Sequence, residues 1–216
     1  MFDFSLTRLL YVIPAIIVAL SLHEYAHARV SYAFGDPTAK QAGRLTLNPI
    51  KHLDIVGTLL LLLAGFGWAK PVPIDPRYFR RPKLGMAVTA LAGPLGNILL
   101  AFVLTGCYGV SLFYYYLTEG QWLFYLTMFF QTAALLSEGL AVFNLLPIPP
   151  LDGSKVLFAL LPNRAYEMLM RCEKYGMVLL IIVLFSGVLD TPLAFLRDGL
   201  LNALSAAAFL PFKLFF

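Results

Sequence analysis

The sequence predicts an all-α, multi-pass membrane protein with about five to six membrane elements, and three observations lead to this fold class. Hydrophobic residues make up 60% of the 216 residues. Charged residues make up 13%, whereas soluble domains average about 25%. The apolar residues form runs that, as helices, can cross a hydrocarbon core of about 30 Å. We therefore expect one membrane-embedded domain over residues 1–216, with a core at about 8–160 and additional membrane helices at 161–216.

The first part of the chain combines one clear span with two shorter features. An apolar run from about Arg8 to Val30 predicts the first transmembrane helix. The polar stretch from Ser31 to Asp54 contains turn signals, and Gly43 to Leu47 within it could form a short β-like stretch. The next apolar run, Ile55 to Gly67, is too short for an ordinary span. We expect this run to be a re-entrant or interfacial segment.

Three further apolar runs and an apolar tail follow. Leu84 to about Leu117 and Gln121 to Leu146 predict two long spans, and Tyr175 to Leu189 predicts another. Prolines in the segment Pro147 to Pro150 should end the second of these helices, because proline cannot continue a regular helix. The tail from Leu193 to Phe216 is apolar but carries three charged residues. It could lie on the membrane surface or cross it.

Positive charges predict how these elements are oriented in the membrane. The loops before and after Ile55 to Gly67 are both rich in Lys and Arg, so both are expected in the cytoplasm. The loop around Glu119 has no Lys or Arg and should be external. The end of the first span and the proline-rich end of Gln121 to Leu146 should then meet near the cytoplasmic surface of a prokaryotic plasma membrane. The net charge of +4 fits this loop bias, and we expect no nucleic-acid partner.

An HExxH motif, His23-Glu24-Tyr25-Ala26-His27, closes the first apolar run. Residues at i and i+4 share a helix face, so His23 and His27 can present two imidazoles to one metal ion. Glu24 is placed to act as a general base toward a water on that metal. Ionisable residues at membrane depth are costly and usually functional. The alternative is a pair of helix-end histidines that are hydrogen-bonded near the interface.

A catalytic zinc normally has three protein ligands and one open position. Asp152 is the best third ligand, because it follows the proline-broken segment and should lie at the depth of the HExxH motif. The alternative is that Asp152 caps the helix that begins at Gly153. Cys107 and Cys172 provide neither a disulfide framework nor a CxxC metal pair.

Several motifs together resemble those of a known family. HEYAH in a membrane helix, AGPLGN from Ala92 to Asn97 and NLLPIPPLDG from Asn144 to Gly153 are similar to motifs of the site-2 protease family of intramembrane zinc proteases. The stretch GRLTLNPIKHLD, from Gly43 to Asp54, is similar to the compact bacterial and archaeal branch of that family, which lacks PDZ and CBS domains. The resemblance covers roughly residues 10–160, with the motifs in family order.

The resemblance implies an intramembrane zinc endopeptidase that cleaves in or near transmembrane segments of protein or peptide substrates. One Zn²⁺ would be held by His23, His27 and Asp152, with Glu24 as the base. A substrate helix hides its carbonyl groups, so it must unwind before it is cut. Gly43 to Leu47 and Leu146 to Leu151 could hold the unwound chain by strand addition. The other expected partner is membrane lipid.

Four more residues are candidates for the site. The resemblance implies that Asn144 helps to bind substrate or the oxyanion, and that Asn97 lies in the helix behind the site. His52 matches a recurring histidine of this branch whose role we cannot assign, and it could simply cap a turn. Glu138 is an intramembrane carboxylate, and therefore either functional or a protonated, hydrogen-bonded packing residue.

Two other functions compete with the protease. Buried His, Glu and Asp side chains could form the ion path of a transporter or channel, but we see no second copy of HExxH or of the proline-broken segment, as internal repeats would require. A catalytically inactive scaffold is the third possibility. The intact HExxH motif and Asp152 argue against it.

Overall fold

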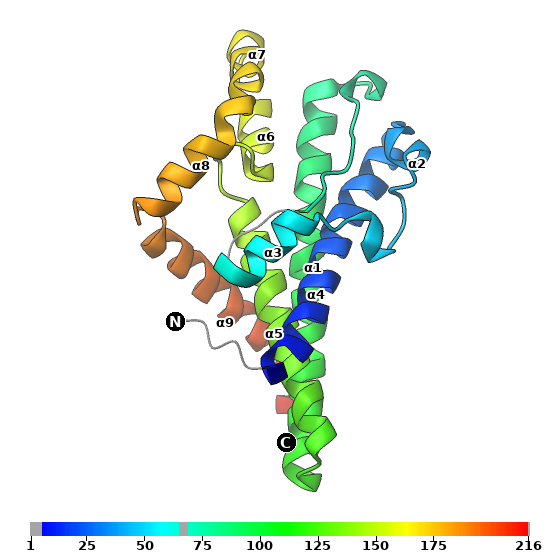
Figure 1. Ribbon diagram of the computed structural model, residues 1–216, viewed down its shortest axis with the longest axis vertical. Helices are drawn as coiled ribbons and strands as arrows, with labels where there is room; N and C mark the ends of the chain where they lie inside the picture. Colours follow the sequence, from blue (N-terminus) through cyan, green and yellow to red (C-terminus); the bar gives the residue numbers. More distant parts are fainter. Residues whose placement is uncertain (1–5, 65–68, 216) are drawn as a thin grey trace.

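The computed structural model describes residues 6–64 and 69–215, and these are mostly helical, with no strand among them. Figure 1 shows three long helices side by side, with shorter helices gathered toward one end. In chain order the elements are α1 (Leu6–Ala33), α2 (Thr38–Gln41), η1 (Pro49–Lys51), α3 (Ile55–Ala64), η2 (Pro76–Tyr78), α4 (Pro82–Thr118), α5 (Gln121–Asn144), α6 (Asp152–Ala159), α7 (Asn163–Cys172), η3 (Glu173–Tyr175), α8 (Gly176–Phe185) and α9 (Asp190–Phe215).

The helices α1, α4 and α5 pack against one another and form the centre of the molecule. A cluster of buried residues joins all three, with Ala15 from α1, Leu104 from α4, and Ala133 and Ala134 from α5. Alanine allows the helix backbones to approach closely, which is how helices commonly pack where lipid removes the hydrophobic driving force. The functional end of α1 is therefore mounted on a close-packed three-helix core.

Three helical stretches are long and apolar enough to cross a membrane: Leu9–Ala33, Pro82–Thr118 and Gln121–Asn144. A fourth span is possible if Asn163–Phe185 and Asp190–Phe209 count together, although they meet at 89°. Within residues 6–64 and 69–215 there are thus three to four candidate spans, and the expected five to six membrane elements are not confirmed. The predicted span Tyr175 to Leu189 is shorter in the structure because α8 ends at Phe185, where a turn leads into α9.

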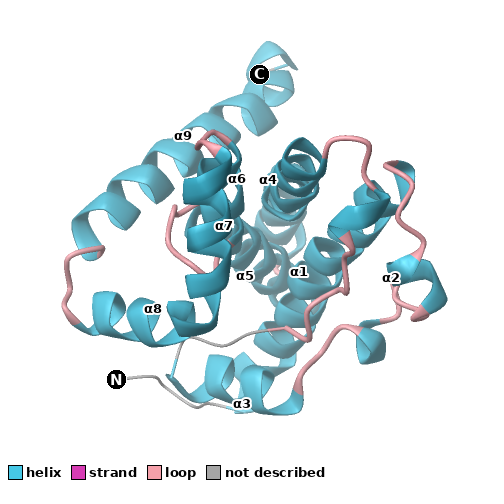
Figure 2. Ribbon diagram, turned by 90° about the horizontal axis from the view of Figure 1, so that it is seen from above, coloured by secondary structure: helices cyan, strands magenta, loops and turns pink. Residues whose placement is uncertain are grey.

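Two segments in the first half of the chain, Gly43 to Leu47 and the run that begins at Ile55, can be compared with their predicted structure. The β-like stretch from Gly43 to Leu47 is not a strand, because Gly43 adopts a left-handed turn with φ of 66° and the residues after it are irregular. The short run from Ile55 is helical to Ala64, and residues 65–67 of that run lie outside the described residues. This α3 helix lies at the outside of the molecule (Figure 2) with exposed leucine and isoleucine side chains, as expected of a segment in contact with lipid.

The C-terminal half closes one end of the bundle. Helix α6 packs against α4, and α9 packs against α4 and α5. A cluster of Leu146, Leu151 and Leu180 ties α8 to the connection between α5 and α6. In Figure 1, α8 and α9 form a bent arm beside the three-helix core. The start of α6, which carries Asp152, therefore lies between this arm and the core.

Candidate metal centre

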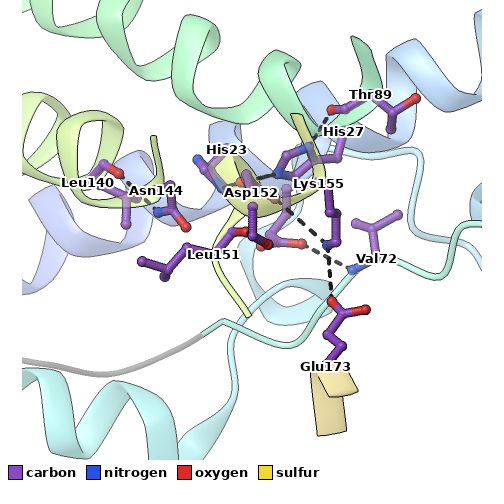
Figure 3. A network of polar contacts seen from close by, with 12 residues as sticks. His23, His27, Val72, Thr89, Leu140, Asn144, Leu151, Asp152, Lys155 and Glu173 are labelled. Atoms are coloured by element: carbon purple, nitrogen blue, oxygen red, sulfur yellow. Dashed lines mark hydrogen bonds and ion pairs between the residues drawn. The ribbon is translucent and has the colours of Figure 1, made fainter. Parts of the chain in front are cut away.

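His23, His27 and Asp152 present three ligand atoms to one point (Figure 3). Asp152 Oδ2 lies 3.1 Å from Nε2 of each histidine, and the two Nε2 atoms are also 3.1 Å apart. In a tetrahedral zinc site with bonds of about 2.0–2.1 Å, ligand atoms lie about 3.3–3.4 Å from one another. The triangle therefore has nearly the size that zinc requires, and two imidazoles with one carboxylate are a ligand set used by zinc enzymes.

The position of Asp152 follows from the chain around it. The irregular segment after α5 turns back, and Leu151, not Asp152, occupies the N-cap of α6, with no side-chain capping bond. The capping alternative for Asp152 is thus not what the structure contains. A Cβ on Gly153 would meet the backbone carbonyl oxygens of Leu145 and Leu146. Only glycine lets α6 begin this close to the end of α5, which brings Asp152 to the histidines.

Neighbouring groups orient the ligands. Nδ1 of His27 donates to the carbonyl oxygen of Thr89 at 2.7 Å, so its Nε2 faces the triangle. Gly93 of α4 lies against both histidine rings, where a Cβ would collide with them. Burial alone would raise the pKa of the Asp152 carboxyl, but hydrogen bonding to His23 and His27 outweighs it, and that pKa lies well below its usual range. Asp152 is therefore a carboxylate, the form that binds metal.

Glu24 is held beside the triangle by a backbone amide. Its Oε2 accepts a hydrogen bond from the N–H of Val72 at 3.1 Å, and the side chain is buried. Val72 belongs to the irregular segment 69–75, which is fixed near both ends. Arg44 donates to the carbonyl oxygen of Lys70, and the amide of Asp75 donates to the buried Asp36 carboxylate at 2.9 Å. No residue pattern predicts this contact, because it uses the backbone amide of Val72, 48 positions from Glu24.

A cavity of about 400 Å³ opens onto these groups. Its lining comes from α1, the segment 69–75, the ends of α4 and α5, α6 and the η3–α8 region. Asn144 lines it, and the Asn144 Nδ2 donates to the carbonyl oxygen of Leu140 at 2.9 Å. The structure thus brings Asn144 together with Glu24 and the three ligand residues in one cavity.

Three other candidates lie elsewhere. His52 is fully buried, its Nε2 donates to the Thr46 carbonyl oxygen at 2.6 Å, and it is not in the metal-competent group. Asn97 and Glu138 are also fully buried, in α4 and α5. Within the described part of the chain, neither lines this cavity, and the Asn97 amide and Glu138 Oε1 have no hydrogen-bond partner.

Two charged residues in the cavity were not anticipated. Lys155 lies on α6 and Glu173 on η3, and both line the cavity. Lys155 could have been found from its spacing, since i and i+3 share a helix face and place it beside Asp152. Glu173 could not, because its position depends on how the C-terminal arm folds back.

Comparison with known proteins finds one matching family model and several similar zinc metalloproteases. The model of peptidase family M50 matches residues 11–187, which include every ligand of the triangle. "Putative zinc metalloprotease YwhC" of Bacillus subtilis is 41% identical over 213 residues, covering 94% of each chain. "Putative zinc metalloprotease Rip2" is 28% identical over 187 residues in Mycolicibacterium smegmatis and 29% over 184 in Mycobacterium tuberculosis, covering 83% of this chain and 68% of each relative. No solved structure matches the chain.

Proposed function

Since the chain belongs to peptidase family M50 and is a zinc metalloprotease, we propose that it is an intramembrane endopeptidase that cleaves in or near transmembrane segments of other proteins. One observation carries the proposal. Two of the three ligand residues lie on α1, a helix long and apolar enough to cross a membrane. A protease whose metal ligands are part of a membrane span is suited to substrates that are themselves in the membrane.

The chemistry assigns a role to each group at the triangle. His23, His27 and Asp152 would hold the Zn²⁺ ion, which when bound supplies Lewis-acid chemistry and lowers the pKa of a bound water toward about 7. The Glu24 carboxylate, oriented by the Val72 amide, takes a proton from the attacking water and delivers it to the leaving nitrogen. One water is consumed, and one carboxyl and one amine are produced.

Asn144 is proposed to contact the bound substrate. One hydrogen of its amide is used by the Leu140 carbonyl oxygen, and the other remains for a substrate carbonyl. Asn97 is proposed to support α4 behind the site, since it does not line the cavity. An unwound substrate would find backbone partners along the irregular segments 69–75 and 146–151, which contribute to the cavity wall.

A route for the substrate is supported by a second, mostly apolar cavity of about 520 Å³ between α1, α5, α8 and α9. Leu20, Leu140, Phe143 and Leu184 line both cavities, so the two adjoin. We propose that a transmembrane segment enters between these helices and unwinds as it reaches the ligand triangle. Unwinding in lipid exposes unpaired backbone groups, so helix-destabilising residues near the scissile bond should speed cleavage.

The charge distribution supports an orientation. The basic loops around α3 favour the cytoplasmic side for the HExxH end of α1, and α3 would dip into the membrane and return. We propose that the site faces the cytoplasmic side of a prokaryotic plasma membrane.

The decisive experiment replaces the base. Glu24→Gln should keep stoichiometric zinc and lose cleavage of a membrane-embedded model substrate, because Glu24 adjoins a ligand without being one. Metal analysis and gel-based cleavage of the purified chain would measure both. Cleavage near the wild-type rate would remove Glu24 from the mechanism. A zinc-loaded wild-type chain that cuts no membrane span would favour an inactive scaffold.

A further inference from the structure

Lys155 extends into the cavity between two carboxylates. Its Nζ lies 4.0 Å from Asp152 Oδ1 and 4.0 Å from Glu173 Oε1 (Figure 3). Its side chain is 24% exposed. Of the described residues that line the cavity, Lys155 is the sole Lys or Arg. The cavity thus holds one permanent cation next to the proposed metal ligands.

The ammonium group of Lys155 has its hydrogen-bond donors available. Distances of 4.0 Å are too long for hydrogen bonds, and within the described chain Lys155 makes none. Other lysines differ: Lys83 Nζ donates to the Leu161 carbonyl oxygen at 2.7 Å, and Lys40 Nζ donates to the Tyr32 hydroxyl at 2.9 Å. An ammonium carries three N–H donors, so Lys155 can donate to an acceptor that enters the cavity.

The two oxygens of Asp152 face different groups. Oδ2 belongs to the ligand triangle, and Oδ1 is the oxygen nearer to Lys155. The ammonium therefore lies on the Oδ1 side of the Asp152 carboxylate, at the edge of the ligand triangle. Glu173 attracts it from the opposite side. Because Glu173 also attracts the ammonium, Lys155 does not form a close ion pair with Asp152.

The alternative donors in the cavity are largely committed. The Val72 amide donates to Glu24, and one hydrogen of the Asn144 amide is used by the Leu140 carbonyl oxygen. Developing negative charge on the scissile carbonyl oxygen is best stabilised by a donor in a site that excludes water. A charged donor is about twice as strong as a neutral one. Lys155 is a charged donor whose hydrogens are not used by other groups, so it can stabilise this negative charge better than the other cavity donors.

We propose, building on the protease function above, that Lys155 is a further catalytic residue that donates a hydrogen bond to the scissile carbonyl oxygen as that oxygen becomes negative. Lys155 keeps its proton throughout, so no bond to it forms or breaks. Glu173 is a positioning residue that holds the ammonium between the substrate and Asp152. The η3 helix, which precedes α8, thereby contributes to catalysis through Glu173.

The test compares Lys155→Met with Lys155→Arg, using Lys174→Met as the matched control. Lys174 adjoins Glu173 but lies over the Tyr175 ring and does not line the cavity. Lys155→Met should lower kcat about 10²–10³-fold, the usual cost of one lost oxyanion donor, with KM nearly unchanged. Lys155→Arg should recover part of kcat, and Lys174→Met should match wild type.

Two binding measurements separate this role from a structural one. Zinc affinity, measured by chelator competition, should not fall in Lys155→Met, because a cation near the ligands repels the metal. A phosphinic peptide that mimics the tetrahedral intermediate should bind Lys155→Met more weakly by about the factor lost in kcat. Uncleaved substrate should bind equally to Glu24→Gln and to Glu24→Gln with Lys155→Met.

The outcomes distinguish the two proposals. If the wild-type chain cleaves the substrate and Lys155→Met has the same kcat, the proposed role of Lys155 is overturned and the protease proposal stands. Loss of zinc in Lys155→Met would overturn it too, in favour of a role in holding Asp152. A wild-type chain that cleaves no membrane span would overturn the protease proposal, and this inference with it. Where Lys155→Met does not elute as a single folded species, Lys155→Leu, which likewise has no side-chain donor, carries the same predictions.

Discussion

Gly93 should be indispensable because it is the contact surface between α4 and the two histidines of the candidate metal centre. A Cβ at this position would lie 2.6 Å from Cε1 of His23 and 2.6 Å from Cε1 of His27. Carbon atoms pack at about 3.5–4.0 Å, so Gly93→Ala requires the rings or α4 to move by about 1 Å. A misplacement of about 1 Å can cost about 10²-fold in rate. We expect a loss of turnover of that order, together with weaker zinc binding.

Purified variants in detergent would be compared by chelator competition for zinc and by cleavage of a transmembrane model substrate. Gly106→Ala is the matched control, because it lies on the same helix and a Cβ there would meet nothing within 4 Å. Alanine in a helix interior is favoured over glycine by about 0.5–1 kcal/mol, so Gly106→Ala should be as stable as wild type or more so. If Gly93→Ala and Gly106→Ala bind zinc and turn over alike, the contact does not constrain the ligands.

Three further predictions test the ligand set, the topology and the support of the cavity. Asp152→Ala should lose zinc and activity while remaining folded in detergent, and full zinc occupancy would place the third ligand elsewhere. Single cysteines at the exposed Gln41 and Tyr78, in a cysteine-free background, should react with an impermeant thiol reagent from the same side of the membrane; labelling from opposite sides would show that α3 spans. Burial raises the pKa of the Asp36 carboxyl, but hydrogen bonds, that from Thr38 the largest, hold it below its usual value. The stabilisation from Asp36 is therefore complete above the ordinary pKa of about 4 and is lost as the pH falls through the lower folded value. Thermal unfolding of Asp36→Ala should accordingly show a lower midpoint at pH 7, with the difference from wild type shrinking in acid; a constant difference would contradict the assignment.

The ligand triangle could be predicted because each of its parts follows a local rule. The spacing of His23 and His27 fixes a shared helix face whatever the rest of the chain does. Asp152 follows a proline-broken end, and charge bias places that end on the same side as the HExxH motif. Their meeting within 3.1 Å then requires only that α1 and α5 pack in the same bundle, which two long apolar helices with small residues readily do.

The predictions that the structure does not confirm rested on length or apolarity alone. Tyr175 to Leu189 is apolar enough for a span, yet Gly187 adopts a φ of 70° and the chain turns between α8 and α9. Gly43 to Leu47 has the composition of a strand, but an isolated strand needs a partner, and the segment lies instead in a turn. A single sequence contains no signal for such tertiary alternatives.

Around the candidate metal centre, helices position the ligand residues, whereas irregular backbone positions the proposed base. The ligands come from helices α1 and α6, whose positions are set by close packing against α4 at Gly93 and against the end of α5 at Gly153. The proposed base is aligned instead by the segment 69–75, which has no helical hydrogen bonds of its own. Irregular backbone is tolerated at membrane depth where it faces protein or a cavity.

Such a segment keeps its place only if it is held from outside. Arg44 holds the carbonyl oxygen of Lys70, Asp36 holds the amide of Asp75, and the His52 carbonyl oxygen accepts the amide of Lys70 at 2.8 Å. The contribution of His52 to this support comes from its backbone carbonyl, while its buried side chain donates to the Thr46 carbonyl oxygen. The ligand positions depend on helix packing, whereas the alignment of the base depends on buried polar groups in the loops. Substitutions at Asp36 or Arg44, whose side chains hold the segment, should therefore impair turnover while sparing zinc binding, whereas the ligand substitutions should remove both.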